Sequence, residues 1–355
     1  MQINNFSAGP SKIPESIIKE ISKDLIDYNK LGYSVLELSH RSDEFSSIVN
    51  KTKDHLIELL GIPNNFEILL LQGGATFQNT FIPANNPEIN NDVAFLLSGT
   101  WGIKTYNDFN HYFNSTVPSV SLQNQSIDEI VYEINNLKEN YLCLTSNETI
   151  EGLQIREFNK FKNKKLIIDM SSDICSYKFD WDNIAYVYAG AQKNLGIPGV
   201  TVCIFEKKFF KDNNLTSYLN AQNHIEKNSA FNTPPTFSIY VMLKVLEWIH
   251  ETGGIEKIEK NSKKKAKYLY DFLDDNNQKL ILNVSKEYRS YSNIVFDFKN
   301  QKLTKLFLEE SISKGFIGLN GHRNVGGIRV SNYNSIELRM IEEFIHHLKV
   351  FLSNN

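Results

Sequence analysis

The chain has 355 residues, a formal net charge of −3 and an isoelectric point near 6.3. This length is sufficient for one large α/β domain and one smaller domain, with a core that needs no covalent staples. The charge balance gives no basic surplus for binding nucleic acid, and no apolar run approaches the roughly 18 residues of a membrane helix. Since the start, MQINNFSAGP, has neither a basic leader nor an apolar segment, we expect a cytoplasmic protein.

The first half of the chain is predicted to alternate strands and helices. Helical spacing covers residues 16–30 and 49–60, and FEILLL at 66–71 predicts a buried strand that is followed by a glycine turn and a further helix. Further strands are predicted at 93–97, 141–144, 166–169, 184–188 and 200–205. This alternation predicts an α/β fold with a mainly parallel sheet flanked by helices.

The last third of the chain is predicted to form a smaller α+β domain. An amphipathic helix at 236–251 ends at Gly253-Gly254, where we expect the domain boundary. A Lys-rich helix at 255–273, strands near 294–298 and 326–331, and a closing helix at 335–352 follow. We therefore expect a large domain at 12–252 and a small C-terminal domain at 253–355, with segment 1–11 near the active site.

Three cysteines, Cys143, Cys175 and Cys203, are widely spaced, and two of them lie in predicted strands. An odd number of cysteines with this spacing is typical of reduced core thiols, not of a disulfide framework or a zinc site. We therefore expect no bound metal.

Lys193 lies in the turn YAGAQKNLGIP, between two predicted strands, where its side chain can stand clear of the sheet. A lysine in such a turn can serve as a nucleophile. It is also one of 32 lysines, however, and a lysine in a loop is usually a solvated surface charge. The residues predicted around it decide between these interpretations.

Three other segments follow the ends of predicted strands, where ligands gather in open parallel sheets. The turn Gly73-Gly74-Ala75-Thr76 can bind phosphate through backbone N–H groups, although it can equally be a tight turn. Trp101 can stack on a flat ligand or belong to the core. Asp169 ends a predicted buried strand, where a carboxylate is costly unless it is paired, or else caps the next turn.

These four features together are the components of a pyridoxal 5′-phosphate (PLP) site. The lysine would form a Schiff base, the glycine turn would bind the phosphate, and the tryptophan would stack on the ring. The carboxylate would keep the pyridine nitrogen protonated, so that the ring can act as an electron sink. Other interpretations must explain each feature separately.

Arginine is rare in this chain, with six residues against 32 lysines, and three of the six lie in two short segments. Arg41 lies in LSHRSDEF, and Arg323 and Arg329 lie in NGHRNVGGIRVSNYN. Lysine cannot replace the planar bidentate guanidinium, so these arginines are candidates for binding substrate anions. The dipeptides His40-Arg41 and His322-Arg323 fit a dianion, although both could be ordinary surface pairs.

Eight segments in order resemble motifs of the phosphoserine aminotransferases, a family of class V, fold type I PLP enzymes. They are NFSAGPSKIP, GYSVLELSHRSDEF, LLQGGATFQ, SNETIEG, IIDMSSDI, YAGAQKNLGIPGVTV, FNTPPTFSIY and GHRNVGGIRVSNYN. The resemblance extends over almost the whole chain. It implies a large domain with a seven-stranded sheet, a homodimer, and amino transfer between L-glutamate and 3-phosphohydroxypyruvate in serine biosynthesis.

The resemblance also implies a role for each matching residue. Lys193 and Asp169 are the catalytic pair, as the Schiff-base lysine and the partner of the pyridine nitrogen. The cofactor-binding residues are Ala75, Thr76, Trp101, Thr149, Asp169, Gln192 and Lys193, with Asn232 and Thr233 reaching the cofactor phosphate of the neighbouring subunit. The substrate-binding residues are His40, Arg41, His322, Arg323 and Arg329, of which Arg329 would hold the α-carboxylate.

Several alternatives remain open from the sequence. Thr76 stands where some relatives have an arginine, which leaves one substrate contact undecided, and a phosphorylated hydroxythreonine analogue of pyridoxine biosynthesis is a further candidate substrate. Another class V aminotransferase, such as an alanine–glyoxylate type, is the nearest alternative. A cysteine desulfurase needs a mobile catalytic cysteine, which the predicted strand positions disfavour. A non-catalytic binding protein on the same fold would not need Lys193 and Asp169.

Overall fold

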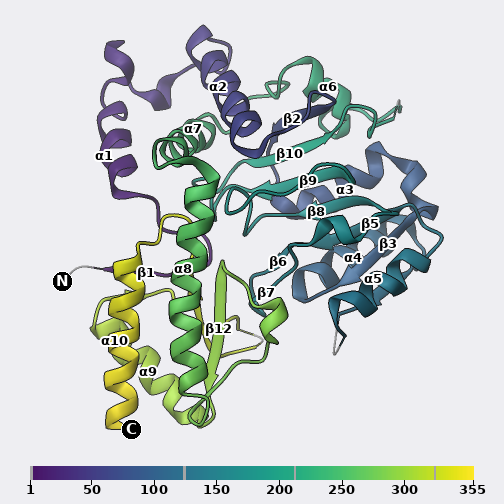
Figure 1. The fold of residues 1–355 in the computed structure, drawn as a ribbon. Helices are drawn as coiled ribbons and strands as arrows, with labels where there is room; N and C mark the ends of the chain where they lie inside the picture. The colour runs from purple at the N-terminus through teal and green to yellow at the C-terminus, as the bar shows by residue number, and fades with distance from the viewer. Residues whose placement is uncertain (1–2, 123–124, 212, 324) are drawn as a thin grey trace.

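A seven-stranded sheet forms the centre of the computed structural model, which describes residues 3–122, 125–211, 213–323 and 325–355 (Figure 1). Strand β10 runs antiparallel to both of its neighbours, β2 and β9, whereas the other adjacent strands are parallel. The predicted mainly parallel sheet is therefore confirmed. In spatial order the strands are β2 (Phe66–Leu71), β10 (Thr201–Glu206), β9 (Ile184–Gly190), β8 (Lys165–Asp169), β5 (Tyr141–Thr145), β3 (Val93–Leu97) and β4 (Ser119–Ser121).

Helices cover both faces of this sheet. Successive side chains of a strand point to opposite faces, so Ile68 and Leu70 of β2 pack on one side and Leu69 and Leu71 on the other. The first face is covered by α1 (Glu15–Asp24), α2 (Asp43–Leu60), α5 (Ile127–Asn136) and α7 (Thr236–Glu251). The second is covered by α3 (Gly74–Asn85), α4 (Thr100–Phe113) and α6 (Ala221–Glu226). Burial on both faces explains why the strands are almost continuously apolar.

The C-terminal elements enclose a second apolar cluster. Helix α8 (Gly254–Asp275) links the two regions, because Ile255 packs in the first cluster and Leu269 in the second (Figure 1). The other elements here are α9 (Gln301–Ser313), α10 (Leu338–Asn354) and the sheet β11 (Leu280–Ile281), β12 (Asn293–Phe298) and β14 (Ile328–Ser331). Strand β1 (Asn4–Asn5) pairs in parallel with β13 (Phe316–Ile317), so the N-terminal segment joins this region.

A short hairpin, β6 (Asn147–Glu148) and β7 (Leu153–Gln154), follows β5 and borders the site described below. The remaining elements are single 3₁₀ turns. They are η1 (Tyr28–Lys30), η2 (Val35–Glu37), η3 (Pro87–Asn91), η4 (Phe158–Lys160), η5 (Ser217–Leu219) and η6 (Lys286–Tyr288). Within the described ranges, no helix is long and apolar enough to cross a membrane.

Three predicted helix boundaries are wrong. The first helix ends at Asp24 and not at residue 30, because the backbone is extended at Asp27 and left-handed at Asn29 and Lys30. The second begins at Asp43, where the Ser42 hydroxyl accepts a hydrogen bond from Phe45 N and caps the helix. The closing helix begins at Leu338, three residues later than predicted.

Candidate active site

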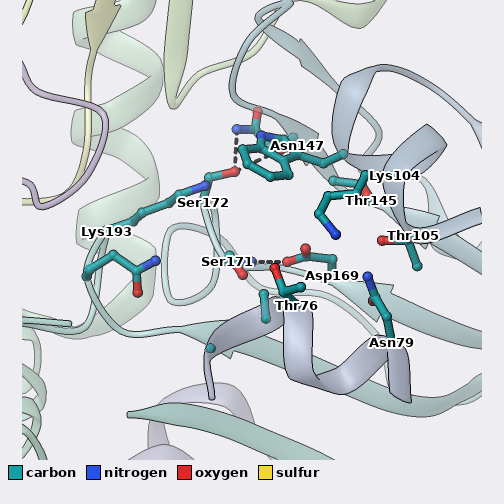
Figure 2. Close-up of a pocket in the computed structure, with 14 residues that line it drawn as sticks. Thr76, Asn79, Lys104, Thr105, Thr145, Asn147, Asp169, Ser171, Ser172 and Lys193 are labelled. Atoms are coloured by element: carbon teal, nitrogen blue, oxygen red, sulfur yellow. Dashed lines mark hydrogen bonds between the residues drawn. The ribbon is translucent and has the colours of Figure 1, made fainter. Parts of the chain in front are cut away.

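A cavity of about 200 Å³ lies at the carboxyl ends of β5 and β8, beside the first turns of α3 and α4. Figure 2 shows Lys193 on one side of this cavity, Lys104 and Thr105 on the other, and Asp169 between them. Elements far apart in the sequence therefore meet at one point. The lining residues are Gly74, Ala75, Thr76, Asn79, Trp101, Lys104, Thr105, Thr145, Asn147, Asp169, Ser171, Ser172, Gln192 and Lys193.

Lys193 is held in the connection between β9 and β10. Its Nζ donates a hydrogen bond to Thr149 Oγ1 over 2.8 Å. Burial lowers the pKa of the Lys193 amine, and nearby Arg329 lowers it further, whereas Asp169 opposes this shift. A lowered pKa increases the fraction of neutral amine, which is the nucleophilic and basic form.

The N-terminal segment supports the turn that carries Lys193. Ser11 N donates to the carbonyl oxygen of Gln192 over 3.0 Å, and the Ser11 hydroxyl donates to the carbonyl oxygen of Lys193. Ser11 thus helps to fix the backbone of the turn.

Asp169 ends β8 with its carboxylate in the cavity. Its Oδ1 accepts a hydrogen bond from Ser171 N over 2.8 Å (Figure 2). Burial raises the pKa of Asp169, while the Ser171 contacts and the charge of Lys193 oppose this effect. A protonated ring nitrogen against this carboxylate would compensate the cost of burying its charge.

The first turn of α3 presents backbone N–H groups that could donate hydrogen bonds to an anion. Gly73 and Gly74 have φ values of 91° and 68°, and a Cβ atom at Gly73 would lie 2.6 Å from Phe77 Cβ. Glycine is therefore required at Gly73. No side chain caps the helix, so N–H groups of the first turn are available to an anion, which the helix dipole also favours.

Two carboxylates that sequence reasoning missed hold the start of α4. Glu148 accepts hydrogen bonds from Trp101 N and Gly102 N, each over 2.9 Å, and Glu151 accepts one from Thr100 N over 3.0 Å. Burial raises the pKa of Glu148 to about 7, and the charge of Glu151 adds to the effect. This clamp positions Trp101, whose Nε1 is buried without a hydrogen-bond partner. The sequence feature from which these contacts could have been expected is the pair of glutamates in the motif SNETIEG.

Arg329 in β14 comes close to the same hairpin. Its Nη1 donates to the carbonyl oxygen of Thr149 over 3.4 Å, and its Nε is buried without a hydrogen-bond partner. Burial lowers the pKa of Arg329, while Tyr333 and Glu151 oppose this effect. A carboxylate ligand would satisfy the remaining donors of this guanidinium.

Eight predicted site residues do not line the cavity in the described chain. Two of them, Thr149 and Arg329, border it through the hydrogen bonds given above, and the other six lie elsewhere. His40 and the exposed Arg41 precede α2, and the exposed Asn232 and Thr233 precede α7. His322 and Arg323 line a separate hollow of about 550 Å³ beside α9. Their functional roles therefore stay predictions.

The cavity also contains polar residues that sequence reasoning did not single out. Asn79 Nδ2 and Lys104 Nζ both contact Asp108 Oδ2, at 2.7 Å and 2.5 Å. Asn147 Nδ2 donates to Ser172 Oγ over 2.7 Å (Figure 2). Residues such as Thr145 and Ser171 could have been found from their positions, because they stand at or just after the ends of β5 and β8. The complete missed set is Asn79, Lys104, Thr105, Thr145, Asn147, Ser171 and Ser172.

Comparison with known proteins decides the family. The model of the aminotransferase class-V family matches residues 3–337. The phosphoserine aminotransferase of Bacillus subtilis (strain 168) is 39% identical over 99% of this chain and 98% of its own. This chain belongs to the phosphoserine aminotransferase family. The resemblance predicted from the eight motifs is thereby confirmed.

Solved structures of phosphoserine aminotransferases have the same fold. The protein from Bacillus circulans subsp. alkalophilus is 35% identical, with a TM-score of 0.93, and the match covers 100% of this chain and 99% of that one. The PLP-bound protein from Trichomonas vaginalis is 28% identical, with a TM-score of 0.90 and coverage of 98% and 100%. The predicted fold of a PLP transferase of type I is confirmed.

Proposed function

We propose that this chain transfers an amino group between L-glutamate and 3-phosphohydroxypyruvate, giving 2-oxoglutarate and O-phospho-L-serine, with PLP as cofactor. The observation that carries this proposal is the convergence of Lys193, Asp169 and the start of α3 on one cavity. We propose the phosphorylated hydroxythreonine analogue of pyridoxine biosynthesis as a second candidate substrate.

The donor groups of the cavity fit PLP. The uncapped first turn of α3, with the Thr76 hydroxyl, provides donors for a phosphate, and Gln192 adds an amide beside it. Trp101 provides a flat face, and Asp169 provides a carboxylate for the pyridine nitrogen. Lys193 provides the amine for the covalent bond. When bound, PLP supplies an electron sink that stabilises negative charge at the substrate α-carbon.

Lys193 is the group that moves the proton. Its lowered pKa favours the neutral amine, which takes a proton from the substrate α-carbon and later returns one. The hydrogen bond to Thr149 holds the amine at the cavity between these events. Asp169 would hold the pyridine nitrogen of the cofactor in its protonated form.

Arginines account for the choice of substrate. Arg329 would hold the α-carboxylate that glutamate and phosphoserine share, because its Nε lacks a partner beside the hairpin. The two His-Arg pairs, His40-Arg41 and His322-Arg323, would hold the distal phosphate or the side-chain carboxylate of glutamate. Charge-assisted contacts of this kind contribute about 1.5–3 kcal/mol each.

A homodimer completes the site in this proposal. Asn232 and Thr233 are exposed and outside the cavity of their own chain, which suits residues that bind the cofactor phosphate of a neighbouring subunit. In a dimer with twofold symmetry, Asn232 and Thr233 of each subunit would reach the cavity of the other subunit through the same interface. Mixing inactive Lys193→Ala chains with Thr233→Ala chains should restore one intact site per hybrid dimer.

We also propose the division into a large domain at 12–252 and a small one at 253–355, joined by α8, with segment 1–11 beside the active site. The second apolar cluster supports this division, because apart from Phe6 it consists of residues from Ala266 onwards.

We place the reaction in the cytoplasm. The three cysteines are free and buried, which suits a reducing compartment.

The substrate assignment is tested by comparing acceptors. Glutamate-dependent turnover of 3-phosphohydroxypyruvate should exceed that of pyruvate and glyoxylate. Arg323→Ala should lower the preference for the phosphorylated acceptor, whereas Arg339→Ala on α10 should not. Equal turnover of all three acceptors by the wild type would overturn the assignment and favour another class V aminotransferase.

A further inference from the structure

Two neighbouring helices bring together two histidines and a glutamate outside the active-site cavity. His55 and Glu58 lie three residues apart on α2, so they share one helix face. His250 lies in the last turn of α7, which packs against α2. One ligand atom from each of the three side chains lies within 4.8 Å of the other two.

The distances within this cluster approach those of a metal site. His250 Nδ1 lies 3.6 Å from Glu58 Oε1, and two ligands of a tetrahedral zinc ion at 2.0–2.1 Å are about 3.3 Å apart. The ring centroids of His55 and His250 are 5.8 Å apart, and the rings are inclined at 61°. With this inclination, one nitrogen of each ring lies within 4.8 Å of the other and of a Glu58 carboxylate oxygen.

The side chains can close the remaining distance. Glu58 and His250 are 63% and 49% exposed, so their rotamers can adjust without disturbing the core. Nδ1 of His55 is buried without a hydrogen-bond partner, so the polar groups of this ring are not all satisfied by the protein. An ordinary surface ion pair between Glu58 and a protonated His250 would leave Nδ1 of His55 without a partner. Such a pair would also add little to the stability of the fold.

We propose that His55, Glu58 and His250 form a binding site for a divalent transition-metal ion of the zinc type. Two imidazoles and one carboxylate are a ligand set that zinc takes in proteins, with water in the fourth position. The cysteine pattern carried no information about this site, since its ligands are histidine and glutamate. The bound ion cross-links the C-terminal parts of α2 and α7.

The cross-link has a structural effect separate from catalysis, since none of the three ligands lines the active-site cavity. An ion that binds only the folded state raises stability by mass action. The expected effects are therefore a zinc-dependent rise in the thermal midpoint and an unchanged rate of amino transfer.

The experiment uses untagged, PLP-loaded full-length protein stripped of metal by a chelator. Zn²⁺ binding is measured by equilibrium dialysis with elemental analysis, and thermal midpoints are recorded with and without Zn²⁺. The variants are His55→Ala, Glu58→Gln and His250→Ala. His111→Ala is the matched control, because His111 is an exposed histidine in the last turn of another helix, α4.

The wild type and His111→Ala should each bind one Zn²⁺ per chain, with a thermal midpoint raised by several degrees. Each ligand variant should bind Zn²⁺ at least roughly tenfold more weakly and lose that rise. Their midpoints without metal show that they are folded. Equal Zn²⁺ affinity in the wild type and His250→Ala would overturn the proposal, as would equal loss of binding in His111→Ala.

Discussion

Thr149 Oγ1 accepts a hydrogen bond from Lys193 Nζ over 2.8 Å, although the two residues are 44 positions apart in the chain. The same threonine offers its carbonyl oxygen to Arg329. One residue of the β6–β7 hairpin therefore touches both the proposed nucleophile and the proposed carboxylate-binding group. In the proposed reaction, the hairpin would set the distance between the Lys193 amine and the arginine that holds the substrate carboxylate.

Replacing Thr149 tests this positioning role. Thr149→Val keeps the shape and removes the hydroxyl, so the amine loses a hydrogen bond with a net contribution of about 1 kcal/mol. We expect kcat to fall about fivefold, with Thr149→Ser close to the wild type. Steady-state rates across pH provide the measurement. A Thr149→Ser enzyme as slow as Thr149→Val would show that the methyl group matters, and not the hydroxyl.

Lys193 should carry the cofactor covalently. Borohydride reduction of the PLP-loaded wild type should fix one cofactor per chain to Lys193, as seen by the mass of the denatured protein and of its peptides. Lys193→Ala should lose this label and at least about 10²-fold in kcat. Lys104→Met is the control, because Lys104 is the other lysine that lines the cavity. A label found on Lys104 in the wild type would refute the assignment.

Asp169 should matter through its charge. Asp169→Asn keeps the size of the side chain but no longer stabilises a protonated ring nitrogen, so we expect kcat to fall about 10²- to 10⁴-fold while the cofactor stays covalently bound. The absorbance of the bound cofactor and the rate of the glutamate half-reaction measure the two effects separately. A half-reaction within threefold of the wild type would contradict this role.

Glu148 should make stability depend on pH. Its folded-state pKa of about 7 lies above the ordinary 4.5, so between these pH values the folded chain binds more protons than the unfolded one. The free energy of unfolding therefore falls as the pH rises through this window, by up to about 3 kcal/mol. Urea midpoints at pH 5 and 7.5 provide the measurement.

Glu148→Gln should flatten that dependence relative to the wild type, because an amide cannot ionise. Glu342→Gln, at an exposed position on α10, is the control and should keep the wild-type slope. Identical slopes in all three proteins would show that Glu148 does not titrate in this window. Since Glu148 accepts the N–H groups of Trp101 and Gly102, the variant should also weaken energy transfer from Trp101 to the bound cofactor.

Much of the fold could be predicted because apolar residues in its main strands and helices form clear runs or recur with a clear period. The strand at 66–71, the strand at 93–97 and the helix at 236–251 were predicted with the observed limits. The start of α2 was missed because only Phe45 and Ile48 are buried among residues 43–48, which precede the predicted start. The antiparallel direction of β10 was not predicted, yet ten residues between Gly190 and Thr201 are too few for a crossover connection.

Residues of the site could be predicted from the sequence only where a recognisable motif lies next to the end of a predicted strand. Lys193, Asp169 and Thr76 were predicted in this way, and the structure places all three at one cavity. Glu148 was not predicted, because its importance depends on burial and on the N–H groups of α4, which are tertiary features. The positions of the two His-Arg pairs likewise depend on contacts between distant segments and do not follow from local sequence.

The most direct test of the proposed function is the reverse reaction of the PLP-loaded protein. O-Phospho-L-serine and 2-oxoglutarate are supplied, and the glutamate formed is measured, with L-serine and L-alanine as alternative donors. We predict rapid glutamate formation from O-phospho-L-serine and a kcat/KM at least roughly 10²-fold lower for the two unphosphorylated donors. Equal rates from L-alanine, or no glutamate from O-phospho-L-serine, would contradict the account.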